Sequence, residues 1–148
     1  MALYHFSVRH VSRGKGQMVV ASAAYISGQR IFDSYYNKIH DYTSKSGVVF
    51  TEILTPEYVP ERLTDRETLW NEVEHVERNN KAQLAYSFDI ALQNELTLEE
   101  NIRLAKEFCQ EQFVARGMIV DLAVHEGKSD NEEEADNPHF HVLVPIRP

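Results

Sequence analysis

Alternation of apolar and polar side chains along the chain predicts five β-strands. Successive residues of a strand point to opposite faces of a sheet, so an alternating segment has one apolar face to bury. In the first segment we expect Tyr4, Phe6 and Val8 to face the core. The alternation is most regular over residues 84–92, and the other four segments are residues 4–9, 47–54, 118–125 and 138–147.

Apolar side chains at helical spacing predict three helices. The first lies within residues 17–30 and is rich in small side chains. The second should follow the capping-box sequence Thr64-Asp65-Arg66-Glu67, and the third should follow Thr97-Leu98-Glu99-Glu100 and end near Gly117. Residues 31–46 have no sustained period and are expected to form a loop or a short hairpin.

The order of these elements, strand-helix-strand-helix-strand-helix-strand-strand, predicts an α+β domain. We expect a largely antiparallel central sheet of about five strands with helices packed against one side. The length of 148 residues fits a single domain with its own core. Because the chain stops directly after the predicted strand at residues 138–147, we expect residues 1–148 to be an excised N-terminal part of a longer protein.

Membrane and redox signals are weak in this sequence. It has no run of about 18 apolar residues, and its N-terminus lacks the basic start and apolar stretch of a signal peptide. The single cysteine, Cys109, falls among the apolar positions of the third predicted helix, which favours a core residue over a nucleophile. These features predict a cytoplasmic protein with no membrane contact.

The net charge of −8 argues at first sight against a nucleic-acid partner, since Lys and Arg supply most of the affinity for phosphates. The charge is unevenly distributed, however. Residues 1–50 have six basic and two acidic side chains, a local charge of +4, which leaves −12 for residues 51–148. Much of the excess negative charge lies in residues 126–136, which we expect to form a mobile surface loop. A DNA-binding surface is therefore compatible with this acidic chain.

Three histidines near the C-terminus predict a metal site. His139 and His141 share one face of their predicted strand, opposite Phe140 and Val142. His125 ends the preceding predicted strand, and antiparallel pairing of the two strands would bring three imidazoles to one place. Three neutral imidazoles leave a divalent metal with open positions for a substrate. Partly buried, hydrogen-bonded histidines without a metal are the alternative.

Tyr25 is the candidate nucleophile. It follows Ala21-Ser22-Ala23-Ala24, so nothing bulky crowds its helical turn. A tyrosine hydroxyl is a poor nucleophile in water, but a nearby cation makes it more reactive, as in DNA strand transfer through a phosphotyrosine. A core tyrosine whose hydroxyl binds a carbonyl is the alternative.

Basic residues in the first 30 positions and an acidic residue of the strand predicted at 84–92 could assist such chemistry. Arg9, Arg13, Lys15 and Arg30 are candidate DNA contacts, and the two in the glycine-flanked turn at residues 13–15 suit a backbone phosphate. Asp89 lies on the polar face of its strand and could orient a histidine by accepting its second N–H. An ordinary strand-to-helix turn and a solvent-facing carboxylate are the alternatives.

Several motifs in the same order resemble the MobA/MobL family of plasmid relaxases over nearly the whole chain. Two of them are Ala21-Ser22-Ala23-Ala24-Tyr25-Ile26-Ser27-Gly28 and Asn137-Pro138-His139-Phe140-His141, and the others are residues 4–7, 12–17, 41–43, 47–49, 69–74, 91–96 and 117–121. Members of this family are HUH endonucleases that nick one DNA strand at an origin of transfer. The resemblance implies that Tyr25 is catalytic and that His125, His139 and His141 bind the metal.

The resemblance also implies a reaction: nicking of single-stranded DNA at a plasmid origin of transfer through a 5′-phosphotyrosine, which initiates conjugative transfer or mobilisation. The expected ion is Mn²⁺ or Mg²⁺, although imidazoles also bind Zn²⁺, Ni²⁺ or Co²⁺. Accessory relaxosome proteins and a coupling protein are further expected partners. The chain departs from the family at Ile26, Asp89 and Gln93 and in its long acidic connection, which affects the expected DNA affinity and sequence preference.

Three other functions remain compatible with the sequence. One is an HUH replication initiator or transposase, which shares the chemistry. Another is a metal-dependent DNA-binding module without nicking activity. The third is a metal-dependent hydrolase that uses water, with Tyr25 as a structural residue. A covalent adduct between the protein and single-stranded DNA would separate the transesterases from the last two.

Overall fold

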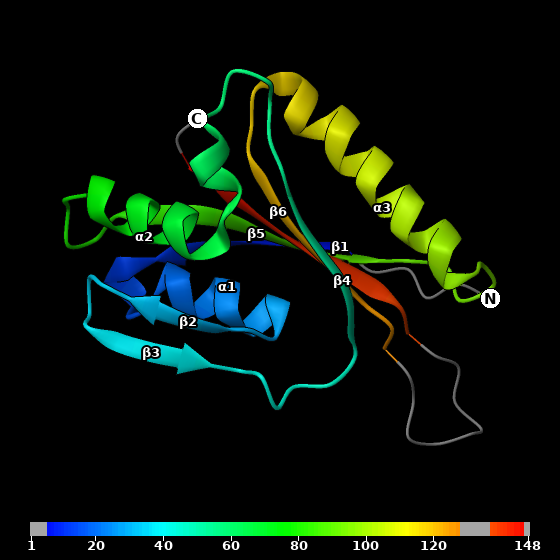
Figure 1. Cartoon of the computed structure of the whole chain (residues 1–148), viewed down its shortest axis with the longest axis horizontal. Helices are drawn as coiled ribbons and strands as arrows, with labels where there is room; N and C mark the ends of the chain where they lie inside the picture. Colours follow the sequence, from blue (N-terminus) through cyan, green and yellow to red (C-terminus); the bar gives the residue numbers. More distant parts are fainter. Residues whose placement is uncertain (1–5, 128–136, 147–148) are drawn as a thin grey trace.

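The computed structural model describes residues 6–127 and 137–146 of the chain (Figure 1). Its centre is one antiparallel sheet of five strands, which confirms the predicted α+β class. In sheet order the strands are β1 (Phe6–Ser12), β5 (Gln83–Ala91), β7 (His139–Pro145), β6 (Val120–His125) and β4 (Val48–Leu54). The other described elements are the helices α1 (Val19–Ser27), α2 (Arg66–Val76) and α3 (Leu98–Gln112), the strands β2 (Arg30–Asp33) and β3 (Lys38–Asp41), and the 3₁₀ turns η1 (Arg13–Lys15), η2 (Glu61–Thr64) and η3 (Val114–Arg116).

Helices cover both faces of this sheet, so the expectation of helices on one side only is wrong (Figure 1). On one face, Cys109 of α3 packs in an apolar core with Leu122 of β6. On the other face, Ala23 of α1 and Trp70 of α2 pack in a second core with Leu143 of β7. Residues that face either side of the sheet are buried in β6 and β7. A sheet with two buried faces needs a helical layer on each side.

The buried side of the first helix combines small residues with Val19, Val20 and Ile26. Ala23 and Ala24 are fully buried. The helix ends at Gly28, whose φ of +65° lies in the left-handed region that favours glycine. A Cβ at this position would also lie 3.3 Å from Val48 Cγ2. The turn that follows α1 therefore passes close to β4.

The expectation that Phe6 and Val8 face the core is wrong, because they are 53% and 47% exposed. β1 is an edge strand, and α3 packs over β4 and β6 at the opposite end of the sheet. The α3 side of β1 is therefore only partly covered, with Phe6 in edge contact with Phe88. Tyr4, the third residue of this expectation, lies outside the described residues.

One of the two predicted capping boxes is confirmed and the other is shifted. At α3, Thr97 accepts the backbone N–H of Glu100 at 3.1 Å, and the Glu100 carboxylate accepts the N–H of Thr97 at 3.0 Å. At α2 the cap is Asp65, which accepts the N–H of Thr68 at 3.1 Å. Thr64 belongs instead to η2, where its hydroxyl donates to the carbonyl of Glu61.

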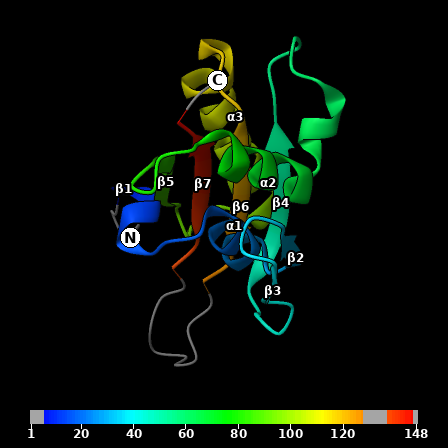
Figure 2. The same ribbon diagram turned by 90° about the vertical axis from the view of Figure 1, so that its left-hand side faces the viewer.

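The segment 31–46 contains most of a β2–β3 hairpin, which packs against α1 (Figure 2). Buried residues explain this packing, since Ile31 belongs to the core beneath α1 and α2. Most of the predicted acidic loop, residues 128–136, lies outside the described residues, so its expected mobility stays a prediction. Within residues 6–127 and 137–146, none of the helices combines the length and apolarity needed to cross a bilayer.

Candidate functional site

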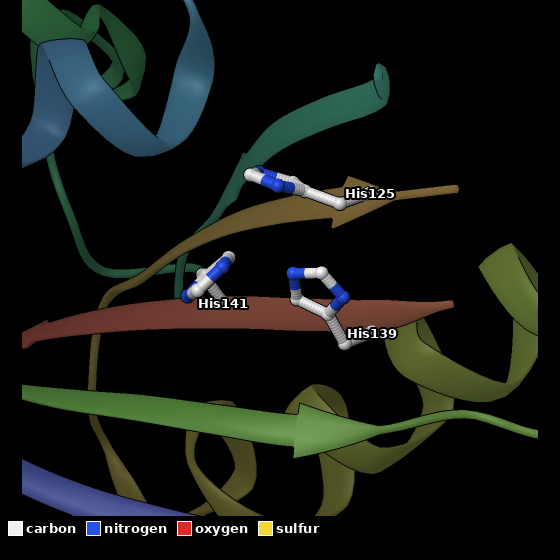
Figure 3. Close-up of side chains that lie close together, drawn as sticks. All are labelled: His125, His139 and His141. Atoms are coloured by element: carbon white, nitrogen blue, oxygen red, sulfur yellow. The ribbon is translucent and has the colours of Figure 1, made fainter. Parts of the chain in front are cut away.

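His125, His139 and His141 come together on the sheet face that α1 covers (Figure 3). β6 and β7 pair antiparallel, with His125 opposite His139 and Ala123 opposite His141. The three ring centroids are 4.6, 4.9 and 5.1 Å apart, and one nitrogen from each ring lies within 4.8 Å of the other two. The predicted convergence of the three imidazoles is therefore confirmed.

Backbone carbonyls fix which ring nitrogens are available. His125 Nε2 lies 2.9 Å from the carbonyl of Ile26, and His139 Nδ1 lies 2.9 Å from the carbonyl of Asn137. A carbonyl only accepts, so each of these nitrogens must carry the proton. Nδ1 of His125 and Nε2 of His139 therefore keep their lone pairs, and such oriented neutral imidazoles are typical of metal ligands.

Burial favours the neutral form of His125 and His141. It lowers the pKa of His125 and lowers the pKa of His141 to about 4, and the positive charge of nearby Lys45 acts in the same direction. The carboxylate of Asp89 opposes burial at both rings. Neutral imidazole is the form that binds a metal, so these residues fit a divalent ion without prior loss of a proton near neutral pH.

Tyr25 lies in the last turn of α1 with its side chain 51% exposed, so the alternative of a core tyrosine does not hold. Its ring meets Tyr42 edge-on, with the centroids 5.3 Å apart. It borders a groove of about 390 Å³ that also reaches His141 of the cluster. The lining residues are Ser7, Arg9, Gln17, Met18, Ala21, Ser22, Tyr25, Ile26, Tyr42, Ser87, Asp89 and His141.

Asp89 lies where it could act on the histidine cluster. It is opposite His141 in the β5–β7 register and opposite Ser7 in the β1–β5 register, and it lines the groove. Its negative charge raises the pKa of His141, against the larger effect of burial. The role of Asp89 in orienting a histidine stays a prediction.

The expectation that Arg13 contacts DNA is wrong. Its guanidinium is buried and forms an ion pair with Glu74 at 2.8 Å. All five of its N–H groups are used, by the Glu74 carboxylate and by the carbonyls of Glu74, Glu77 and Asn79. No donor is left for a phosphate, and Arg13 instead fastens η1 to α2.

The other three basic candidates differ in position. Arg9 is exposed on β1 and lines the groove beside Tyr25. Lys15 is exposed in η1. Arg30 is exposed on β2, 3.9 Å from Asp41, and is not among the residues that line the groove. Only Arg9 therefore lies beside the candidate nucleophile, and the DNA contacts of all three stay predictions.

Comparison with known proteins agrees with the resemblance in the sequence. The MobA/MobL family model matches residues 17–148. The chain is 37% identical to the conjugal transfer protein TraA of Rhizobium radiobacter, over 100% of this chain and 14% of TraA. It is 33% identical to the mobilization protein MobL of Acidithiobacillus ferridurans, over 98% of this chain and 38% of MobL. The chain belongs to the MobA/MobL family.

A solved structure supports the same fold. It concerns the molecular basis of vancomycin resistance transfer in Staphylococcus aureus, and it superimposes with a TM-score of 0.88 at 40% identity. The match covers 99% of this chain and 72% of that chain. This MobA/MobL chain therefore spans only part of the relatives it matches, namely 14% of TraA and 38% of MobL.

One residue of this MobA/MobL site was not predicted from the sequence. Lys45 Nζ lies 3.5 Å from the centroid of the Tyr25 ring and donates to the Tyr25 carbonyl at 2.9 Å. In the sequence it is an isolated lysine in a stretch without a period, and only its place just after the family motif at residues 41–43 could have drawn attention to it.

Proposed function

We propose that this MobA/MobL chain is the DNA-nicking part of a relaxase, which cleaves one strand at a plasmid origin of transfer and so initiates conjugative transfer or mobilisation. One observation carries the proposal: Tyr25 and His141 of the three-histidine cluster line the same groove. The relatives named for conjugal transfer and mobilization support it. A nucleophile beside a metal-binding cluster is the arrangement that phosphoryl transfer by a side chain needs.

The side chains have distinct roles in this reaction. His125, His139 and His141 would bind a divalent ion, which would supply positive charge to the non-bridging oxygens of the scissile phosphate. The Tyr25 oxygen attacks phosphorus in line and loses its proton to solvent. The new O–P bond makes a 5′-phosphotyrosine, and the broken P–O3′ bond leaves a 3′-oxygen that takes up a proton. No bond energy is lost to water, so the strands can later be rejoined.

Two further residues would support the site. Arg9 is exposed and lines the groove beside Tyr25, where its guanidinium can pair with a DNA phosphate. Asp89 would hold the ring of His141 by accepting an N–H, which also raises the basicity of a ligating imidazole. The ion would be Mn²⁺ or Mg²⁺, and the further partners would be relaxosome proteins and a coupling protein in the cytoplasm.

A covalent adduct tests the proposal. The protein is mixed with a random-sequence pool of single-stranded oligonucleotides labelled at the 3′ end, with Mn²⁺, and run on a denaturing gel. We expect labelled protein from wild type and none from Tyr25→Phe. Because Tyr25 is half exposed, the variant should keep its thermal stability and its DNA affinity. Tyr58→Phe, a tyrosine 71% exposed and absent from the groove lining, is the matched control.

Each other outcome points to a different function. DNA cleavage without an adduct, equal in wild type and Tyr25→Phe, would indicate hydrolysis by water. Metal-dependent DNA binding with neither cleavage nor adduct would indicate a binding module. Sequencing of the captured strands gives the preferred sequence 3′ of the cut. Cleavage assays on single-stranded DNA from an origin of transfer, a replication origin and a transposon end that contain this sequence then separate the three kinds of transesterase.

A further inference from the structure

The last turn of α1 contains the candidate nucleophile Tyr25, and it also contacts His125 of the three-histidine cluster. Carbonyls in the final turn of a helix have no partner inside the helix. Here the carbonyl of Tyr25 accepts from Lys45 Nζ at 2.9 Å, and the carbonyl of Ile26 accepts from His125 Nε2 at 2.9 Å. Two adjacent carbonyls therefore tie α1 to the loop after β3 and to the end of β6.

Lys45 also touches the Tyr25 side chain. Its ammonium lies over the ring face, 3.5 Å from the centroid, while Tyr42 meets the same ring edge-on. A cation over an aromatic face is attracted by the negative face of the ring, and the attraction grows when the ring oxygen becomes an anion. The ring of Tyr25 thus contacts both Lys45 and Tyr42, while the residue remains half exposed.

The loop that carries Lys45 is held in place by its own hydrogen bonds. Asp41 accepts the backbone N–H of Thr43 at 2.9 Å, and the N–H of Lys45 donates to the carbonyl of Tyr42 at 3.0 Å. At the far end, the carbonyl of Gly47 accepts the N–H of Glu126 at 2.9 Å, next to His125. Gly47 has a φ of +92°, which only glycine adopts readily. The backbone at Lys45 is therefore held in place next to α1 and the end of β6.

We propose that Lys45 is the positioning residue of the Tyr25 nucleophile: it holds the tyrosine in the groove and stabilises its phenolate as the oxygen attacks phosphorus. The inference rests on the proposed nicking function. A lysine that only capped the C-terminus of α1 would satisfy the Tyr25 carbonyl equally well, since cations are favourable at that end of a helix. A capping role does not require the ammonium to lie over the ring face, as it does here.

The test separates chemistry from binding and folding. Lys45→Met removes the charge and keeps the length of the side chain, Lys45→Arg keeps the charge, and Lys38→Met removes an equal charge from the exposed surface of β3. Each variant is assayed for thermal midpoint, for affinity to the oligonucleotide captured by wild type, and for the rate of adduct formation at saturating DNA. The ε-methylene proton shifts of Lys45 are followed by NMR in the DNA-free protein.

We expect the adduct rate of Lys45→Met to fall roughly 10- to 100-fold, with DNA affinity changed less than about 3-fold, because the lost charge acts on the attacking oxygen. Lys45→Arg should recover most of the rate, and Lys38→Met should match wild type. The ring current of Tyr25 should move the Lys45 ε-methylene signal upfield, and Tyr25→Leu should abolish that displacement.

The opposite results overturn the inference. An unchanged adduct rate in Lys45→Met, with or without a lower thermal midpoint, would leave Lys45 a helix cap only. An equal loss of rate and DNA affinity would make it a general DNA contact. A wild-type protein that forms no adduct would overturn the nicking function as well, while the NMR shift would still report whether Lys45 lies over the ring.

Discussion

The two faces of the central sheet differ in the side chains that they present. In β7, Phe140, Val142 and Val144 point to α3 and pack in an apolar core. The alternate residues of that strand point to α1, and two of them, His139 and His141, belong to the three-histidine cluster. Both faces therefore have an apolar core, whereas the three-histidine cluster and Tyr25 lie on the α1 face.

Polar groups on the α1 face are themselves of two kinds. Some are buried and fully paired: Arg13 with Glu74, and Asp121 with Arg66 and the indole N–H of Trp70 at 2.8 Å. Others, such as Tyr25 and Arg9, are open to the groove. A buried group whose hydrogen bonds are all satisfied serves the fold, whereas an open one can meet a ligand. The predictions below test this division.

The largest effect should come from the buried ion pair. Arg13→Met leaves the fully buried carboxylate of Glu74 without its partner, which should destabilise the protein by about 3–5 kcal/mol. Urea denaturation measures this loss. Lys15→Met, an exposed neighbour in η1, should change stability by no more than about 0.5 kcal/mol. Normal stability of Arg13→Met together with weaker DNA binding would restore Arg13 as a phosphate contact.

We expect side chains on the α3 face to affect the stability of the fold but not metal binding. Leu122 is fully buried there, so Leu122→Ala should cost about 2–5 kcal/mol through lost burial and a cavity. Leu104→Ala makes the same change at a residue of α3 that is 44% exposed and should cost much less. Calorimetric titration with Mn²⁺ should give the wild-type affinity for both variants. A weaker metal affinity in Leu122→Ala would show that the two faces are not independent.

Much of this division could be predicted from the sequence, because it follows from periodicity. Alternation places His139 and His141 on one face of their strand, and antiparallel pairing with the preceding strand adds His125. The Thr97 capping box is local, since both of its partners lie within one helical turn. The equally local box at Thr64 was shifted by one residue, because Thr64 ends the 3₁₀ turn η2 and Asp65 caps α2 instead.

The remainder depends on contacts between distant residues. Arg13 resembles a phosphate contact in the sequence, and only the approach of Glu74, 61 positions away, shows that its donors are used. Lys45 meets Tyr25 across 20 positions, through a loop with no regular pattern. The exposure of Phe6 follows from where α3 lies on the sheet, which the alternation of β1 cannot indicate. The roles of Tyr25 and the histidines rest on the family resemblance until they are tested.

A smaller effect is expected from replacing His141, which is half-buried and also lines the groove. Its replacement by Asn should weaken Mn²⁺ binding about 10-fold or more, as expected when a ligand or its support is lost. The variant should also change how stability depends on pH. Burial lowers the pKa of His141 to about 4 from 6.5, so between these values the unfolded chain holds a proton that the folded protein does not.

The sign of that pH dependence follows directly. The stability that His141 contributes is complete above pH 6.5 and is lost as the pH falls toward 4, because protons then favour the unfolded chain. Urea midpoints of the metal-free protein, measured across this range, should fall more steeply for wild type than for His141→Asn. Parallel curves would mean that His141 is not held neutral by the fold.

The smallest effect is expected from the acidic segment between β6 and β7. Its ends are held together beside the histidine cluster, since the N–H of Asn137 donates to the carbonyl of Gly127 at 2.8 Å. Five acidic residues between those ends should therefore repel DNA phosphates that approach the groove; they are Asp130, Glu132, Glu133, Glu134 and Asp136. The repulsion should discourage non-cognate strands more than it affects the chemistry.

Replacing those five acids by Asn and Gln should tighten binding of single-stranded DNA a few-fold at low salt, where the screening length is about 30 Å, and hardly at all near 0.1 M, where it is about 10 Å. Glu107→Gln and Glu111→Gln remove charges from α3, on the opposite face, and should have less effect per charge. Mn²⁺ affinity should stay the same in every variant. DNA affinities that match wild type at all salt concentrations would mean that this segment has no electrostatic role. The difference between the two faces would then be limited to the side chains on the sheet and its helices.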